Sequence, residues 1–177
     1  MRVVVVGDVL LDEDIDGVAT RLSPEAPVSV VDVSSRTRRA GGAGLVATML
    51  AQDGVDVELV TALAFDDAAF AVRDCLGGVS LVAGNARAAT PVKTRLRAEG
   101  HAVARIDDAC GEPPGPEVTP RMVAAIRSAD AVVVADYGRG IAAHPRIRDA
   151  LERRRSKPCR SAWRPPASTF GAAASQR

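Results

Sequence analysis

Short aliphatic runs alternate with stretches of helical periodicity along most of this chain. Four runs are typical of buried strands: residues 3–6 (VVVV), 55–63 (VDVELVTAL), 79–84 (VSLVAG) and 131–135 (AVVVA). Apolar residues at helical spacing, with glycine or acidic residues at the ends, predict helices at 43–52 and within 65–78, 120–130 and 144–155. Strands and helices in alternation predict an α/β sandwich around a parallel sheet.

Two segments break this alternation with a β period of two. Residues 26–40 (APVSVVDVSSRTRRA) alternate without a helix before them, and residues 90–108 form two alternating stretches around Glu99-Gly100. We therefore expect a separate small sheet, with strands at about 26–39 and 90–107.

The periodicity ends after about residue 155. Residues 152–177 carry seven Lys or Arg and one Glu, so this tail has a charge of about +6 and the remainder about −5. We interpret 1–151 as the folded part and 152–177 as a disordered tail or the product of a shifted reading frame. No buried strand follows the last helix, so the strand at 131–135 is expected at an open sheet edge with exposed apolar residues.

Composition excludes several classes of function. An acidic body argues against nucleic-acid binding, and no apolar stretch is long enough for a signal peptide or a membrane span. Cys75, Cys110 and Cys159 are far apart without metal-ligand spacing, which predicts reduced thiols and no metal site. A cytoplasmic location is expected.

The glycines at 41, 42 and 44 open the helix at 43–52. The segment GGAGLVAT lacks the lysine of a phosphate-binding P-loop, and it does not follow the first strand as a dinucleotide fingerprint would. Two interpretations remain: backbone amides that approach a polar ligand, or a turn that lets the helix pack tightly.

Six segments in order resemble the N-terminal half of the ribokinase-like (PfkB) sugar kinases. They are VVGDVLLD, LSPEAPVSVVDV, RAGGAGLVATMLAQDG, TALAFDDAA, TPVKTRLRAEGHAVARID and ADAVVVADYGRGI, and they span residues 2–151. SPEAPV together with DYGRG resembles the branch that phosphorylates heptose 7-phosphate at O1. The resemblance implies a three-layer sandwich with a parallel central sheet and a small β-lid, truncated at the C-terminus.

The resemblance also implies a sugar site. Asp12 corresponds to the aspartate that binds sugar hydroxyls, and Gly41 and Gly42 correspond to the glycine pair whose amides approach the sugar. Leu45 stands where the family usually has a hydrogen-bonding Asn, and a leucine can neither donate nor accept.

Four further residues are site candidates. Lys93 and Arg105 match family positions that would offset the charge of a sugar phosphate, although either could equally belong to the solvated face of a β-ribbon, and Arg105 could pair with Asp107. Asp136 and Arg139 follow a buried strand at its C-terminal end, where ligands bind in open α/β sheets. His101 and His144 are expected at the surface.

The family's reaction requires ATP and Mg²⁺, with a base and an anion hole supplied by a G-A-G-D segment. This sequence contains no such segment, so we assign no catalytic residue and expect no turnover by the chain alone. The alternatives are a sugar-phosphate kinase that needs a missing half, or a non-catalytic remnant that binds a sugar phosphate. A homodimer through the β-lid is possible in either case.

Overall fold

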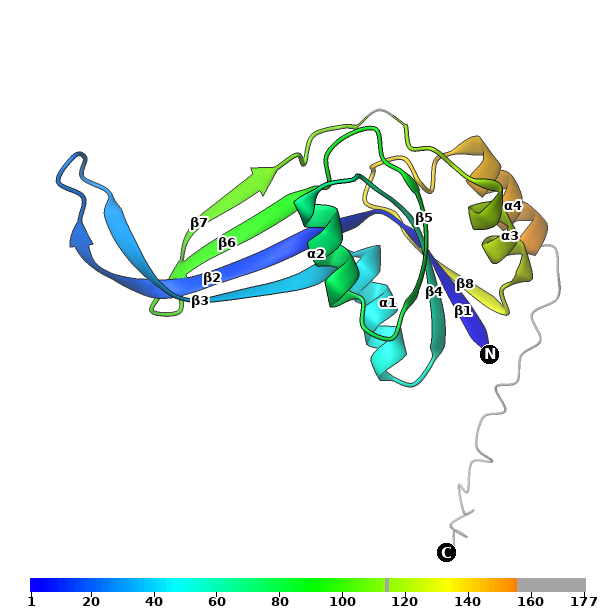
Figure 1. Ribbon diagram of the computed structural model, residues 1–177, viewed down its shortest axis with the longest axis horizontal. Coiled ribbons are helices and arrows are strands. Elements are labelled where there is room, and N and C mark those ends of the chain that lie inside the picture. Colours follow the sequence, from blue (N-terminus) through cyan, green and yellow to red (C-terminus); the bar gives the residue numbers. More distant parts are fainter. Residues whose placement is uncertain (114, 156–177) are drawn as a thin grey trace, which may run out of the picture.

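The computed structural model describes residues 1–113 and 115–155, which form two four-stranded sheets (Figure 1). The first sheet is parallel throughout and has the order β5-β4-β1-β8. Its strands are β1 (Arg2–Gly7), β4 (Asp56–Leu63), β5 (Ser80–Asn85) and β8 (Ala131–Ala135). The four aliphatic runs of the sequence therefore form the parallel sheet that they predict.

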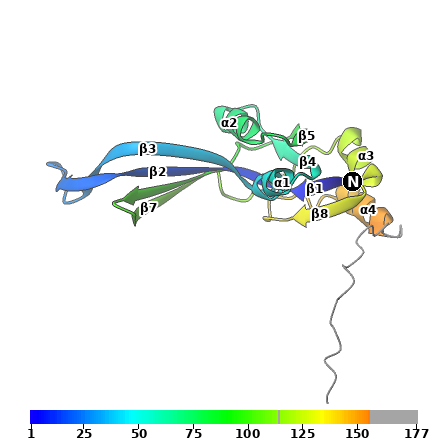
Figure 2. The same ribbon diagram turned by 90° about the horizontal axis from the view of Figure 1, so that it is seen from below.

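Helices cover both faces of the parallel sheet, which gives three layers (Figure 2). Val4 and Val6 of β1 pack in one cluster with α3 (Pro120–Ser128) and α4 (Pro145–Arg155). Val5, between them, packs in the other cluster with α1 (Ala43–Gln52) and α2 (Asp67–Cys75). A strand that is buried on both faces needs valines at every position, and this explains the uninterrupted run in β1. The predicted α/β sandwich is confirmed.

The second sheet, here called the lid, extends away from the parallel sheet (Figure 1). Its order is β3-β2-β6-β7, with β2 at Val9–Leu22, β3 at Ser29–Gly42, β6 at Val92–Ala98 and β7 at His101–Asp108. The expected hairpin at 90–107 corresponds to β6 and β7.

The other lid hairpin differs from the sequence-based expectation. Residues 9–22 form the long strand β2, which pairs with β3 and β6, whereas the sequence predicted no strand there. No element was predicted for this acidic segment, which follows the glycine that ends the first strand. In the structure β2 lies between two basic strands, and Glu13, for example, accepts a hydrogen bond from Arg38 at 2.9 Å. Charge pairing across the sheet therefore stabilises a strand that no hydrophobic pattern reveals.

The strand β8 lies at an edge of the parallel sheet, as expected, and β5 forms the opposite edge. Two apolar side chains of β8 are exposed, Val133 by 36% and Val134 by 47%. The helix α4 continues to Arg155, so the first residues of the basic segment 152–177 are helical. The rest of that predicted tail lies outside the described residues.

The start of α2 is tied to the segment that enters the lid. Asp66 caps the helix by accepting a hydrogen bond from the Ala69 amide at 2.8 Å, and it accepts another from the Thr90 amide at 2.8 Å. Partial burial raises the pKa of Asp66, but these backbone donors lower it more, so the pKa lies below its ordinary value of 3.8. The ionised carboxylate is therefore the form that stabilises the fold.

We expect Asp66→Ala to lower the free energy of unfolding by about 1–2 kcal/mol at pH 7, because a helix cap and a tie to Thr90 are lost. Asp66 stabilises the fold above pH 3.8, and this contribution is lost as the pH falls through the lowered pKa of the folded state. Urea denaturation of both proteins across pH 3–7 would measure the difference. Asp67→Ala is the control, with an expected loss of about 0.5 kcal/mol; equal losses for the two variants would contradict the assignment.

Candidate functional site

One face of the lid carries a row of charged side chains that crosses all four strands. The strand register sets Asp12 of β2 opposite Arg39 of β3 on one side and opposite Lys93 of β6 on the other. Lys93 in turn is opposite Asp107 of β7. Directly paired residues point to the same face of a sheet, so these four side chains share one face.

The two β2 carboxylates of this face, Asp12 and Asp14, are largely shielded from solvent and paired. Asp12 is 7% exposed, and its Oδ1 accepts a hydrogen bond from Arg95 Nη1 at 2.7 Å. Asp14 pairs with Arg39. Among the residues that the structure describes, Lys93 has no carboxylate oxygen within 4.0 Å, and neither has Arg97, further along β6 on the same face. A cation without an ion pair therefore lies next to Asp12 on this face.

Arg105 shares this face but is engaged elsewhere. Its Nε and Nη2 donate to the two carboxylate oxygens of Asp107 at 2.7 and 2.6 Å. These hydrogen bonds lower the pKa of Asp107 and raise that of Arg105. Both side chains are open to solvent, so the pair stabilises the fold little. The pairing that the sequence allowed is present, whereas a role for Arg105 in ligand binding stays a prediction.

The glycine pair allows two close backbone approaches. A Cβ on Gly41 would lie 2.4 Å from Asp12 Oδ2, and a Cβ on Gly42 would lie 2.4 Å from the carbonyl oxygen of Asp8. Gly42 also has φ of +59°, a conformation that favours glycine, immediately before α1 begins. Gly41 thus lies against the Asp12 carboxylate, while Gly42 turns the chain from the lid into the helix.

Asp8 was not predicted as a site residue from the sequence. This residue is 4% exposed, and its carboxylate accepts backbone hydrogen bonds from Tyr137 at 3.1 Å, Arg139 at 3.0 Å and Ile141 at 3.3 Å. A single buried carboxylate therefore holds the glycine-rich loop that follows β8. The available signal was a carboxylate directly after a four-valine strand and a glycine, at the end of the sheet where ligands bind.

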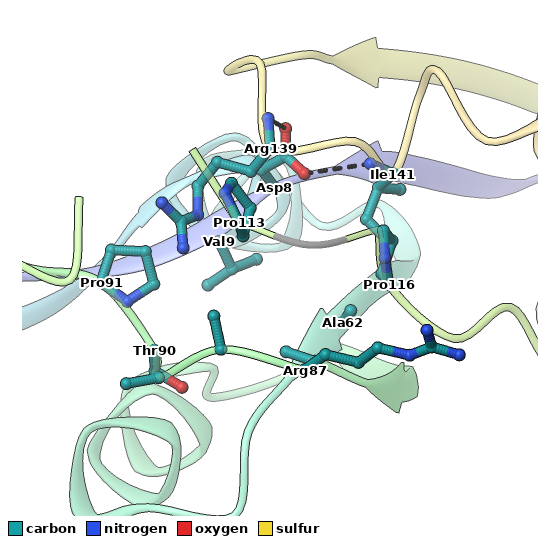
Figure 3. Close-up of a pocket in the computed structure, with 13 residues that line it drawn as sticks. Asp8, Val9, Ala62, Arg87, Thr90, Pro91, Pro113, Pro116, Arg139 and Ile141 are labelled. Carbon is teal, nitrogen blue, oxygen red and sulfur yellow. Dashed lines mark hydrogen bonds between the residues drawn. The ribbon is translucent and has the colours of Figure 1, made fainter. Parts of the chain in front are cut away.

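Asp8 and Arg139 line a small pocket at the C-terminal ends of the parallel strands. Asp8, Arg139 and Ile141 form one end of it, and Arg87 and Thr90 lie at the other (Figure 3). Arg139 Nη1 donates to the carbonyl oxygen of Gly111 at 2.8 Å, which joins the loop after β8 to the segment after the lid.

The sequence-predicted residues are thus divided between two places. Asp12, Gly41, Lys93 and Arg105 belong to the lid, and none of them lines the small pocket. Asp136 lies in the loop after β8, is exposed, and accepts a hydrogen bond from the Gly138 amide at 2.9 Å. Leu45, at the family's Asn position, is 39% exposed on α1.

The described residues do not fit a magnesium site. No group of three or more His, Cys, Asp or Glu side chains in residues 1–113 and 115–155 is arranged to hold a metal ion. Within the same ranges, no helix is long and apolar enough to cross a membrane.

Solved structures share this fold at low sequence identity. Ribokinase of Arabidopsis thaliana, complexed with ribose and ATP, superposes with a TM-score of 0.59 at 16% identity, over 86% of this chain and 50% of that one. Phosphofructokinase-2 of Escherichia coli, in complex with fructose-6-phosphate, also gives 0.59, at 14% identity, over 86% of this chain and 52% of that one. The chain therefore has the fold of the N-terminal half of the ribokinase-like (PfkB) kinases, which confirms the resemblance drawn from the sequence.

Sequence comparison adds a more particular relationship. The bifunctional protein HldE of Streptomyces coelicolor is 41% identical over 152 residues, which are 85% of this chain and 32% of HldE. HldE of Nitrosococcus oceani is 37% identical, over 86% of this chain and 33% of that protein. The chain thus spans about a third of the length of these relatives. No family model matches it.

We expect Asp8→Ala to lower the free energy of unfolding by about 3 kcal/mol, because three amides of the loop after β8 lose their buried acceptor. Asp136→Ala is the control in the same region, since it removes a single exposed acceptor and should cost under about 1 kcal/mol. Urea denaturation measures both. Equal, small losses would show that Asp8 does not hold the loop.

Proposed function

We propose that this chain is the sugar-binding part of an ATP-dependent carbohydrate kinase whose substrate is a sugar phosphate. The observation that carries the proposal is the placement of Lys93 beside Asp12, with Asp12 held against Gly41. Related HldE proteins and solved ribokinase-like structures support a kinase of sugars.

Asp12 and Lys93 would bind different parts of a sugar phosphate. A carboxylate can accept hydrogen bonds from two sugar hydroxyls at once, and Arg95 holds Asp12 through a hydrogen bond to its Oδ1. The Lys93 ammonium has no carboxylate partner on the lid face, so a phosphate can neutralise it without breaking an existing ion pair. Hydroxyls and a phosphate at neighbouring positions describe a phosphorylated sugar.

Within that class we propose heptose 7-phosphate, phosphorylated at O1. The sequence identity to HldE supports this substrate, and so do the SPEAPV and DYGRG segments. Lys93 and Arg105 would face the 7-phosphate, and Asp136 and Arg139 would face the reacting end of the sugar.

The described residues do not fit the Mg²⁺ that the kinase reaction requires. Among the described residues, no carboxylate cluster suits Mg²⁺, and the full sequence contains no G-A-G-D segment to supply a base and an anion hole. We therefore propose that the chain alone binds the sugar phosphate without turning it over. A non-catalytic sugar-phosphate-binding protein is the second candidate on the same observation.

A homodimer through the lid is also proposed. The lid strands expose Val18, Val33, Val103 and Ile106, each by more than 40%. Exposed apolar residues on a projecting sheet favour burial against a second sheet.

Titration calorimetry with heptose 7-phosphate and then with ATP tests the proposed function. Heat with the sugar and none with ATP would support a sugar site on a catalytically incomplete unit. Turnover of ATP that depends on the sugar would show a complete kinase, and no heat with the sugar would contradict the proposal.

Gly41→Ala tests the approach between Gly41 and Asp12. The added methyl group meets only the flexible ends of Asp12 and Leu10 at under 3 Å, so the fold should survive while the carboxylate is displaced. We expect sugar affinity to fall at least about tenfold, as for the loss of one charge-assisted hydrogen bond. Gly77→Ala is the control, since nothing lies within 4 Å of its Cβ position. Calorimetry should show unchanged binding by the control; unchanged binding by both would place the sugar elsewhere.

Lys93→Met tests the charge of the lid face. We expect affinity for the sugar phosphate to fall about 10- to 100-fold, and affinity for the unphosphorylated sugar to change little. Arg97→Met, an exposed cation on the same strand, is the control and should leave both affinities unchanged. If Lys93→Met weakened both sugars equally, the lysine would not be the phosphate contact.

A further inference from the structure

Arg95 does not form its hydrogen bond with the carboxylate that lies directly opposite to it in the lid. The register of β2 and β6 sets Arg95 opposite Asp14, and it sets Lys93 opposite Asp12. Arg95 Nη1 nevertheless donates to Asp12 Oδ1 at 2.7 Å and lies 4.0 Å from Asp14 Oδ1. Directly opposed residues are the nearest neighbours across a sheet, so Arg95 bonds to its diagonal neighbour instead of the nearest one. One guanidinium is thus shared unequally between two carboxylates.

The hydrogen bond to Asp12 leaves a buried acceptor of Asp14 without a donor. Asp14 Oδ2 pairs with Arg39, but Asp14 Oδ1 is shielded from solvent and accepts no hydrogen bond from any described residue. A carboxylate oxygen that is neither hydrated nor hydrogen-bonded is unfavourable. A shift of about 1 Å would bring Arg95 Nη1 within hydrogen-bond distance of Asp14 Oδ1. The same guanidinium therefore has a second acceptor within reach.

A sugar that binds Asp12 competes with Arg95 for the same carboxylate. Asp12 is 7% exposed, its Oδ1 is held by Arg95, and its Oδ2 lies against Gly41. If Arg95 were displaced into no other contact, a largely buried cation would lose its partner, which is costly. Transfer to Asp14 avoids this cost, because a sugar hydroxyl then donates to Asp12 and the guanidinium donates to Asp14.

We propose that Arg95 is a positioning residue that moves from Asp12 to Asp14 when sugar hydroxyls bind Asp12. The inference rests on the proposed function, since it concerns the same site, and it adds Arg95 and Asp14 to that site. It also gives the site a basis for selectivity. A ligand that offers Asp12 no hydroxyl leaves Arg95 in place, whereas a ligand with hydroxyls at that position displaces it.

The variant Asp12→Asn tests the exchange without any sugar. The amide has the shape of the carboxylate but no charge, so the ionised Asp14 becomes the stronger acceptor for Arg95. A crystal structure of this variant should show Arg95 Nη1 within about 3.2 Å of Asp14 Oδ1. Arg95 still bonded to position 12, with Nη1 at its present 4.0 Å from Asp14 Oδ1, would overturn the proposal.

Titration calorimetry with heptose 7-phosphate tests the exchange with Asp12 unaltered. Asp14→Asn should weaken sugar binding at least about tenfold, because Arg95 loses the charge that would receive it. In an Arg95→Met background, the same change should alter the affinity less than about twofold. The pair between Asp14 and Arg39 is affected in both backgrounds, so its contribution cancels. Equal losses in the two backgrounds would show a merely structural role for Asp14 and would overturn the proposal.

Asp16→Asn is the matched control for Asp14→Asn. Asp16 lies two residues further along β2 on the same face, opposite Arg97, and forms no ion pair with Arg95. Its replacement should change sugar affinity less than about twofold, and an effect equal to that of Asp14→Asn would count against the exchange. Circular dichroism checks that each variant folds, and if Asp12→Asn does not, the calorimetric cycle decides. If the unaltered chain bound no heptose 7-phosphate, the proposed function would fail, whereas the structure of Asp12→Asn would still show where Arg95 goes.

Discussion

The arrangement of the two sheets depends on Asp8. This residue stands alone between the end of β1 at Gly7 and the start of β2 at Val9, where the chain leaves the parallel sheet and enters the lid. Its amide donates to the Ala135 carbonyl at 3.3 Å, its carbonyl accepts from the Ala43 amide at 2.9 Å, and its carboxylate holds the loop after β8. One residue therefore fixes the lid, the first turn of α1 and the DYGRG loop relative to one another. A buried carboxylate is tolerated in this position because three backbone amides donate hydrogen bonds to it.

Charge complementarity specifies the lid itself. The acidic strand β2 lies between the basic strands β3 and β6, and the register sets Asp12 and Asp14 beside Arg39 and Arg95. A slip of one residue would move every one of these side chains to the opposite face, so the ion pairs define the register. The same register sets Lys93 between Asp12 and Asp107, with neither carboxylate within 4.0 Å of its ammonium. The candidate sugar-phosphate site is therefore a consequence of how the lid is paired.

Hydrophobic periodicity and the residues at helix ends predicted the elements that these short-range patterns define. The helix at 43–52 was predicted with the bounds that α1 has, one of the acidic residues at the start of the helix within 65–78 caps α2, and the strand at 131–135 is an edge of the sheet. The strand β2 was missed because its acidic residues carry no strand period and because one of its two partners, β6, is distant in sequence. Missing β2 also hid Arg95 as the partner of Asp12, since the two are 83 positions apart and meet only when β2 pairs with β6. The role of Asp8 was not predicted because its partners are backbone amides, and no side-chain motif in the sequence indicates them.

The central claim is that Asp12, Gly41 and Lys93 form a sugar-phosphate site on the lid. The most direct measurement is a crystal structure of the chain with heptose 7-phosphate bound. The account predicts sugar hydroxyls within hydrogen-bond distance of the Asp12 carboxylate and the phosphate beside the Lys93 ammonium. A sugar bound only in the small pocket between Asp8 and Thr90, with Asp12 still paired to Arg95 alone, would contradict it.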